Sequence, residues 1–114
     1  SMGIKVEYNP DLALRNISEF KAGRRKKEEC IPEPLKKGLV YNFLKKEQRL
    51  YWLYGEIPLL ETKGSQRMSF PIASIVILEA THVLINKEVW TKGKYKVIEV
   101  FKDKQAHFNG FAKI

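Results

Sequence analysis

Apolar residues are densest between positions 69 and 101, in a stretch that also contains two turn signals. Its middle, residues 72–78, has apolar side chains at both odd-numbered and even-numbered positions, the two parities of a strand. Ile75 and Ile77 are at odd positions, and Val76 is at an even one. Successive side chains of a strand point to opposite faces, so a strand that is apolar at both parities is typical of one covered on both sides. The pattern therefore predicts a central strand here.

Short strands separated by polar turns are predicted after this centre. They are expected at 83–85, 88–90, 94–101 and 108–114. A tight turn is predicted at Asn86-Lys87, because Asn tolerates positive φ angles. Thr91-Lys92-Gly93 is interpreted as the next turn, with the glycine supplying a positive φ.

The N-terminal third mixes two periodicities. Residues 3–8 alternate between apolar and polar side chains, which predicts a short strand. Residues 10–21 are predicted to form a short helix, with Asn9 as its cap and an end at Gly23. The apolar residues of this helix recur at spacings of three and four: Ala13, Leu14, Ile17 and Phe20.

A long connection is predicted at 22–38. It contains the basic run 24–27, with the sequence RRKK, and it ends near Pro32 and Pro34, which cannot continue a helix. Long connections in small domains are uncommon and often functional, although a charged run of this kind is also typical of a solvated loop.

The middle of the chain has a β pattern rich in aromatic residues. Strands are predicted at 39–44 and 49–54, joined by a polar turn at 45–48 into a hairpin. A third strand is predicted at 56–62, with Pro58 confined to an edge or an irregular start. A polar loop follows at 63–67.

These elements lack the long helical segments that βαβ units need, so a parallel α/β sheet is excluded. The expected fold is mainly β (α+β). It is a small antiparallel β-barrel or highly curved sheet of about six to eight short strands, with one short N-terminal helix.

The composition bounds the class of protein. The 114 residues are expected to form one domain over 3–114, with Ser1-Met2 as a cloning remnant. The single cysteine, Cys30, excludes an internal disulfide and favours a reducing, cytoplasmic setting. No apolar run approaches the ~20 residues needed to cross a bilayer, so no membrane partner is expected.

Known catalytic and metal-binding patterns are missing from the sequence. Glu79 and His82 are three residues apart, which places them on opposite faces of a regular strand. Cys30 has no histidine near it in sequence, and the T-K-G triplets at 62–64 and 91–93 lack the Walker spacing. We therefore expect no metal, no cofactor and no catalytic residue.

The remaining signal is charge combined with aromatic residues. Lys and Arg number 21 against 13 Asp and Glu, which gives a net charge of +8 spread evenly along the chain. Cations beside aromatic rings are typical of proteins that hold single-stranded nucleic acid. The candidate RNA- or DNA-binding residues are Arg24, Arg25, Lys26, Lys27, Lys45, Lys46, Arg49, Tyr51 and Trp52.

Three other interpretations stay open. Both faces of the segment 49–54 would be buried if its aromatic residues simply fill a small β core. The same residues would bind a protein partner if the chain is an adaptor or a phage or host-defence protein. A small hydrolase or nuclease would need clustered acids or histidines, which are scattered here. The sequence favours the non-enzymatic nucleic-acid-binding module.

Overall fold

The structure is a computed structural model, and it describes residues 7–63 and 68–102. Two predicted elements fall mainly beyond these ranges: the last strand, 108–114, lies outside the described residues, and so does most of the first, 3–8. The predicted loop at 63–67 is described only at Lys63.

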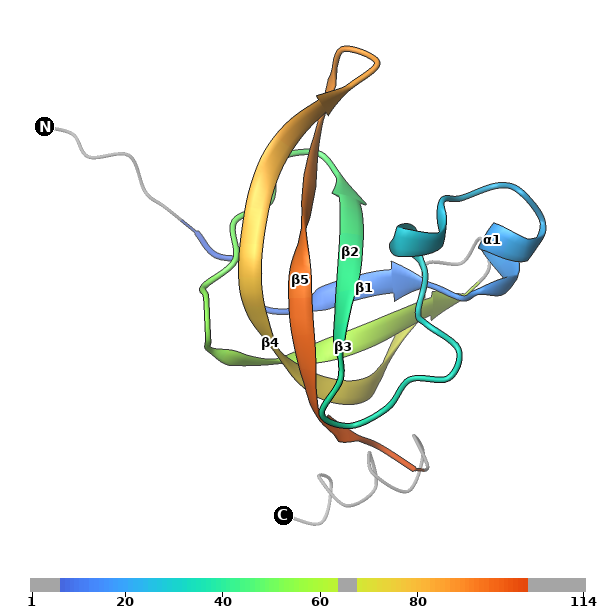
Figure 1. Cartoon of the computed structure of the whole chain (residues 1–114), viewed down its shortest axis with the longest axis vertical. Helices are drawn as coiled ribbons and strands as arrows, with labels where there is room; N and C mark the ends of the chain where they lie inside the picture. Colours follow the sequence, from blue (N-terminus) through green and yellow to red (C-terminus); the bar gives the residue numbers. More distant parts are fainter. Residues whose placement is uncertain (1–6, 64–67, 103–114) are drawn as a thin grey trace, which may run out of the picture.

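The described residues form one five-stranded sheet that curls into a half-barrel (Figure 1). The strands are β1 (Leu12–Arg15), β2 (Val40–Lys46), β3 (Glu56–Lys63), β4 (Met68–Ile85) and β5 (Glu88–Val100). Their order across the sheet is β1-β3-β4-β5-β2; β1 and β3 are parallel, and every other pair is antiparallel. The predicted mainly-β, highly curved fold is confirmed.

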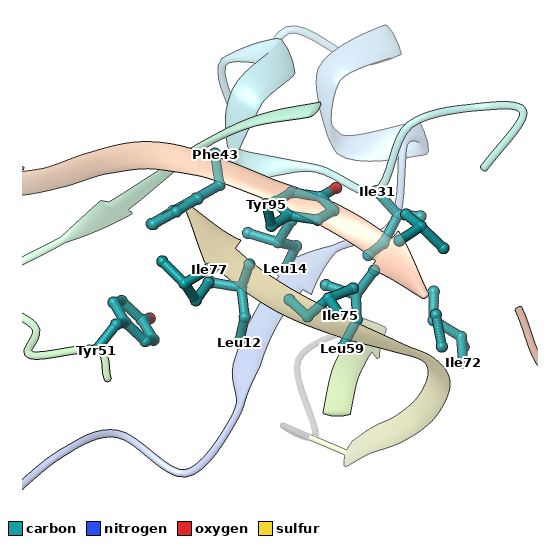
Figure 2. Packing of buried hydrophobic residues seen from close by; sticks show 12 residues of the cluster. Leu12, Leu14, Ile31, Phe43, Tyr51, Leu59, Ile72, Ile75, Ile77 and Tyr95 are labelled. Carbon is teal, nitrogen blue, oxygen red and sulfur yellow. The ribbon is translucent and has the colours of Figure 1, made fainter. Parts of the chain in front are cut away.

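The predicted central strand is the middle of β4, which is the third of the five strands. Ile75 and Ile77 are fully buried, whereas Val76 and Leu78 on the other parity are half-buried. The core therefore lies on one face of β4, inside the curl, and the opposite face is only partly covered. Figure 2 shows Ile75 and Ile77 packed with leucines of β1 and β3 and with Tyr95 of β5.

β4 and β5 are longer than predicted, because neighbouring predicted strands merge. The predicted turn at Asn86-Lys87 is confirmed: it joins β4 to β5, and both residues have positive φ angles, 51° and 68°. The predicted turn at 91–93 is wrong, since Thr91, Lys92 and Gly93 all lie within β5 and pair with both β2 and β4.

The predicted helix over 10–21 is largely wrong. Its first half is β1, which pairs in parallel with β3 and buries Leu12 and Leu14 at alternate positions. Only the one-turn helix α1 (Ser18–Lys21) remains, and Phe20 on it is exposed. Pairing with a strand more than 40 residues away outweighs a local pattern that suits either a helix or a strand.

The predicted strand at 49–54 and its hairpin are also wrong. β2 pairs with β5 instead, and residues 48–55 form an irregular loop between β2 and β3. The loop is held at Leu50, whose carbonyl accepts a hydrogen bond from the Asn9 amide at 2.7 Å. At its far end the Tyr54 amide donates to the Ile77 carbonyl of β4 at 2.8 Å. Tyr54 has a positive φ of 65°, which is incompatible with a continuous strand.

The half-barrel leaves a seam between its two edge strands, β1 and β2. The connection from α1 to β2 covers this seam, and it contains the short 3₁₀ helix η1 (Lys27–Glu29), which packs on β2. Cys30 forms an isolated bridge to Arg15 of β1, and the Ile31 amide donates to the Arg15 carbonyl at 2.8 Å. The predicted long connection is thus part of the core, with Cys30 and Ile31 buried.

Within the described ranges, no helix is long and apolar enough to span a membrane.

Candidate functional site

The basic run 24–27 is ordered by its acidic neighbours. The guanidinium of Arg24 binds both carboxylate oxygens of Glu19, at 3.0 and 3.1 Å, and this contact lowers the pKa of the Glu19 carboxyl group. Arg25 forms an ion pair with Glu29 at 3.1 Å. The two arginines are therefore largely neutralised within the protein.

Lys26 and Lys27 remain exposed at the start of η1. The Lys26 amide donates to the carboxylate of Glu29 at 3.0 Å, which fixes the backbone of this turn. Among the described residues neither ammonium group forms an ion pair. Of the predicted run, these two lysines keep their charge available to a ligand.

Lys45 points into the seam. Its ammonium group donates a hydrogen bond to the Ala13 carbonyl of β1, so it links the two edge strands of the half-barrel. Burial lowers its pKa to about 8. An ammonium group committed to the interior is a structural group, and Lys45 is therefore removed from the candidate phosphate contacts.

Lys46 is the last residue of β2, and Arg49 lies in the loop that follows it. The Lys46 ammonium group sits 5.7 Å from the ring centroid of Trp90, within the range of a cation–π contact. Arg49 is half-buried: its amide donates to the Thr91 hydroxyl at 2.8 Å, and its Nε donates to the Lys46 carbonyl at 3.0 Å. Lys46 is exposed and free to meet a ligand, whereas Arg49 mainly fixes the loop.

Tyr51 and Trp52 have opposite environments. Tyr51 is 7% exposed and packs edge-on against Phe43 with 5.5 Å between ring centroids, and burial raises its pKa to about 12. Trp52 is 69% exposed and lies 5.7 Å from the ring of Tyr8. The interpretation that both faces of 49–54 are buried is therefore wrong. Tyr51 belongs to the core (Figure 2), and only Trp52 can offer a stacking surface.

A row of lysines lies on the outer face of β5. Gly93, Tyr95 and Val97 alternate with them along the strand and are buried, whereas Lys92, Lys94 and Lys96 are exposed. We call these three residues the lysine row. No ion pair within the described part of the chain involves any of them.

The sequence carries a signal for this row, because lysines alternate in KGKYK at 92–96. The incorrectly predicted turn at 91–93 separated Lys92 from the other two lysines and hid the pattern. Pairing with β2 places Lys46 opposite Trp90, one step beyond the row, so four lysines lie on this face of β2 and β5.

A cleft of about 550 Å³ adjoins the lysine row. Lys92 and Lys94 of β5 line it together with Asn42 of β2, Glu79 of β4 and Glu28 of η1. Two segments that are far apart in the sequence, η1 with β2 and the β4–β5 hairpin, thus form one concavity. The sequence pattern does not relate Glu28, Asn42 and Glu79 to one another, because their proximity comes only from strand pairing and from the packing of η1 on β2.

The remaining reactive side chains do not form a site. Glu79 pairs with Lys94 and His82 with Thr91, so the two side chains leave opposite faces of β4, as their spacing predicts. His82 Nε2 lies 3.0 Å from the Arg49 carbonyl. Burial raises the pKa of the Cys30 thiol, which makes it less reactive. Among the described residues, no group of three or more His, Cys, Asp or Glu could hold a metal ion.

Comparison of the chain with protein-family models, curated proteins and solved structures found no match.

Proposed function

We propose that this protein is a non-enzymatic nucleic-acid-binding module that contacts phosphates through the lysine row. The observation that carries the proposal is the alignment of Lys92, Lys94 and Lys96 on one exposed face, where none of them forms an ion pair with a described residue. Alternate strand residues are about 7 Å apart, so the three ammonium groups repel one another in the free protein. A polyanion relieves this repulsion and releases its own counterions on binding.

The other predicted residues take secondary positions in this proposal. Lys46 of β2 lies opposite Trp90 and adds a fourth lysine at the end of the lysine row. Lys26 and Lys27 precede Glu28 in the chain and add positive charge near the cleft that Glu28 lines. Trp52 is a candidate for stacking on an unpaired base, since its ring is exposed. Arg24 and Arg25 contribute less, because Glu19 and Glu29 bind them.

Fluorescence anisotropy with labelled single-stranded and duplex oligonucleotides over a salt series tests the proposal. The wild-type protein is expected to bind more weakly as salt rises. Changing the lysine row to glutamine (K92Q, K94Q, K96Q) should reduce the slope of log K against log salt by about 2, since each phosphate contact on a single strand contributes about 0.7.

A matched control removes the same charge elsewhere. Lys36, Lys63 and Lys87 are exposed and lie outside β5. The triple variant K36Q, K63Q, K87Q should keep most of the salt slope. Equal losses in the two triple variants would show that net charge alone drives binding. Absence of binding at low salt would refute the proposal.

A second candidate function is supported by an exposed apolar surface around the β2–β3 loop. Five residues form this loop surface: Tyr8, Leu50, Trp52, Leu53 and Tyr54, which are 36–70% exposed. Exposed Trp and Tyr are enriched at the centres of protein–protein interfaces. A protein partner is therefore the alternative ligand, and it would bind here rather than at the lysine row.

The double variant Trp52→Ala, Tyr54→Ala separates the two functions. If a protein partner binds the loop surface, the wild-type chain should retain it after nuclease treatment and the double variant should lose it. If nucleic acid binds only through the lysine row, oligonucleotide affinity should be unchanged in the double variant. A loss of oligonucleotide affinity would instead place bases on these rings.

A further inference from the structure

The cleft beside the lysine row has a mixed charge that phosphate binding alone does not explain. Lys92 and Lys94 share it with two carboxylates, Glu28 and Glu79, and both acids are exposed. A carboxylate next to a phosphate is repelled by it. The two acids must therefore face a part of the ligand that is not anionic, and that part must carry hydrogen-bond donors.

Strand register places the polar groups of the cleft next to one another. Asn42 of β2, Lys94 of β5 and Glu79 of β4 are direct partners across three neighbouring strands. Neighbouring strands are about 4.8 Å apart, so an amide, an ammonium group and a carboxylate stand side by side over about 10 Å. This spacing suits a ligand that combines an anion with a small polar ring.

The apolar lining gives such a ring a surface on which to lie. Leu44 is buried in the wall of the cleft, and Val83 is half-buried opposite it, on the arm of β4 that extends beyond β3. Clefts of roughly 300–1,000 Å³ hold small molecules of this kind, with a few polar groups fixing their orientation. At about 550 Å³ the cleft has room for a base that is turned out of its strand.

We infer that the cleft holds a nucleobase with an exocyclic amino group, taken from a strand whose phosphates lie on the lysine row. The inference deepens the proposed function and rests on it. Carboxylates accept hydrogen bonds from the amino groups of bases such as cytosine, and an Asn amide can pair with adenine. Uracil presents one carbonyl oxygen, O4, in place of the amino group, and the carboxylates of Glu28 and Glu79 repel it.

Cytosine and uracil oligomers of equal length test the inference, because they have the same phosphates and differ at two ring positions: the amino group of cytosine is a carbonyl in uracil, and the neighbouring N3 carries a hydrogen only in uracil. Lengths of about 12 nucleotides cover the site of a small domain. Deoxycytidine oligomers should bind roughly tenfold more tightly than deoxyuridine oligomers in anisotropy titrations at fixed salt. The double variant Glu28→Gln, Glu79→Gln should lose most of this preference, because a neutral amide accepts either base.

Glu88→Gln serves as the matched control. Glu88 is exposed near the tip of the β4–β5 hairpin and does not line the cleft. Its variant should bind both oligomers slightly more tightly, owing to the lost negative charge, and should keep the preference for cytosine. Salt-dependent binding with equal affinity for the two oligomers would overturn the inference and leave the proposed function standing. A preference that survives Glu28→Gln, Glu79→Gln would overturn it too. Absence of binding to either oligomer would overturn both.

Discussion

Gly93 lies where β2, β4 and β5 come closest to one another. A Cβ atom at this position would clash with the Glu79 carbonyl oxygen of β4 and would lie 2.8 Å from a ring carbon of Phe43. The register of β4 shifts between Ile77 and Glu79, which brings that carbonyl inward. Glycine is needed here for close backbone approach rather than for a turn.

Substitution of Gly93 is therefore expected to strain the sheet. Gly93→Ala should lower the free energy of unfolding by about 1–3 kcal/mol, as overpacking does elsewhere. Urea unfolding, with the slope unchanged and the midpoint lowered, measures this effect. Gly55→Ala is the control, because its added Cβ would meet only the Trp52 carbonyl at 3.9 Å. Equal effects at the two glycines would contradict the close approach.

The environments of single residues also decide which of the predicted binding residues can contact a ligand. Tyr51 and Trp52 are neighbours in an aromatic segment, and composition favours neither as the exposed one. The structure buries Tyr51 against Phe43 and leaves Trp52 exposed. Lys45 and Lys46 differ in the same way, because strand alternation turns Lys45 into the seam and Lys46 outward over Trp90. Adjacent residues of similar chemistry thus have different roles.

The turn of the β4–β5 hairpin is the feature that the sequence predicts best. It has positive φ at both central residues, as a type I′ turn requires. Asn86 suits this conformation, whereas Lys87 at φ 68° carries the penalty of a side chain in the left-handed region. The hairpin therefore contains a local strain that one substitution can relieve.

Lys87→Gly should raise the free energy of unfolding by roughly 0.5–1 kcal/mol, because glycine adopts positive φ without the Cβ penalty. Thermal or urea unfolding of the purified variant measures the change. Lys87→Ala removes the same charge and keeps the Cβ atom, so it should not stabilise the protein. If both variants gained equally, reduced charge repulsion would explain the effect and the strain would not.

Other elements were mispredicted because their pairing is long-range. The segment 39–54 has the appearance of a hairpin, yet β2 pairs with β5, about 50 residues away. Residues 12–15 fit a helical period, yet they pair with β3 and bury Leu12 and Leu14. The spacing of apolar residues indicates which side chains are buried, but it does not indicate which other strand or helix covers them.

At the scale of the whole molecule, residues 7–63 and 68–102 form a sheet that curls without closing. Lys45 spans the open seam between β1 and β2 by donating to the Ala13 carbonyl. The segment that contains η1 and Cys30 covers the same seam. A lysine pKa of about 8 means that burial of its charge works against folding at neutral pH.

The stability of the protein should therefore rise with pH above neutrality. Between about pH 8 and the unfolded pKa of 10.5, the unfolded chain binds more protons at Lys45 than the native one, so the free energy of unfolding increases with pH. Urea unfolding from about pH 7 to 9 should show a gain of about 1 kcal/mol. Lys45→Met keeps the apolar part of the side chain, and it should remove most of the dependence of the free energy of unfolding on pH.

The pH range is limited at its upper end by groups whose pKa burial raises. The ordinary pKa is 9.0 for the Cys30 thiol and 10 for the phenols of Tyr51 and Tyr95. Stability falls again as pH rises above these values, because the native state keeps protons that the unfolded chain loses. Measurements below about pH 9 separate these groups from Lys45. If the free energy of unfolding of Lys45→Met rose with pH as steeply as that of the wild type, a group other than Lys45 would be titrating in this pH range.

The sequence by itself determined the mainly-β class, the central position of β4, the β2 and β3 segments and the Asn86-Lys87 turn. These features follow from strand alternation and turn chemistry, which depend on neighbouring residues. Tertiary structure alone decided that β1 pairs with β3 and β2 with β5, and so which lysines face outward. It also brought Glu28, Asn42 and Glu79 to one cleft, because strand register joins residues that no local pattern relates.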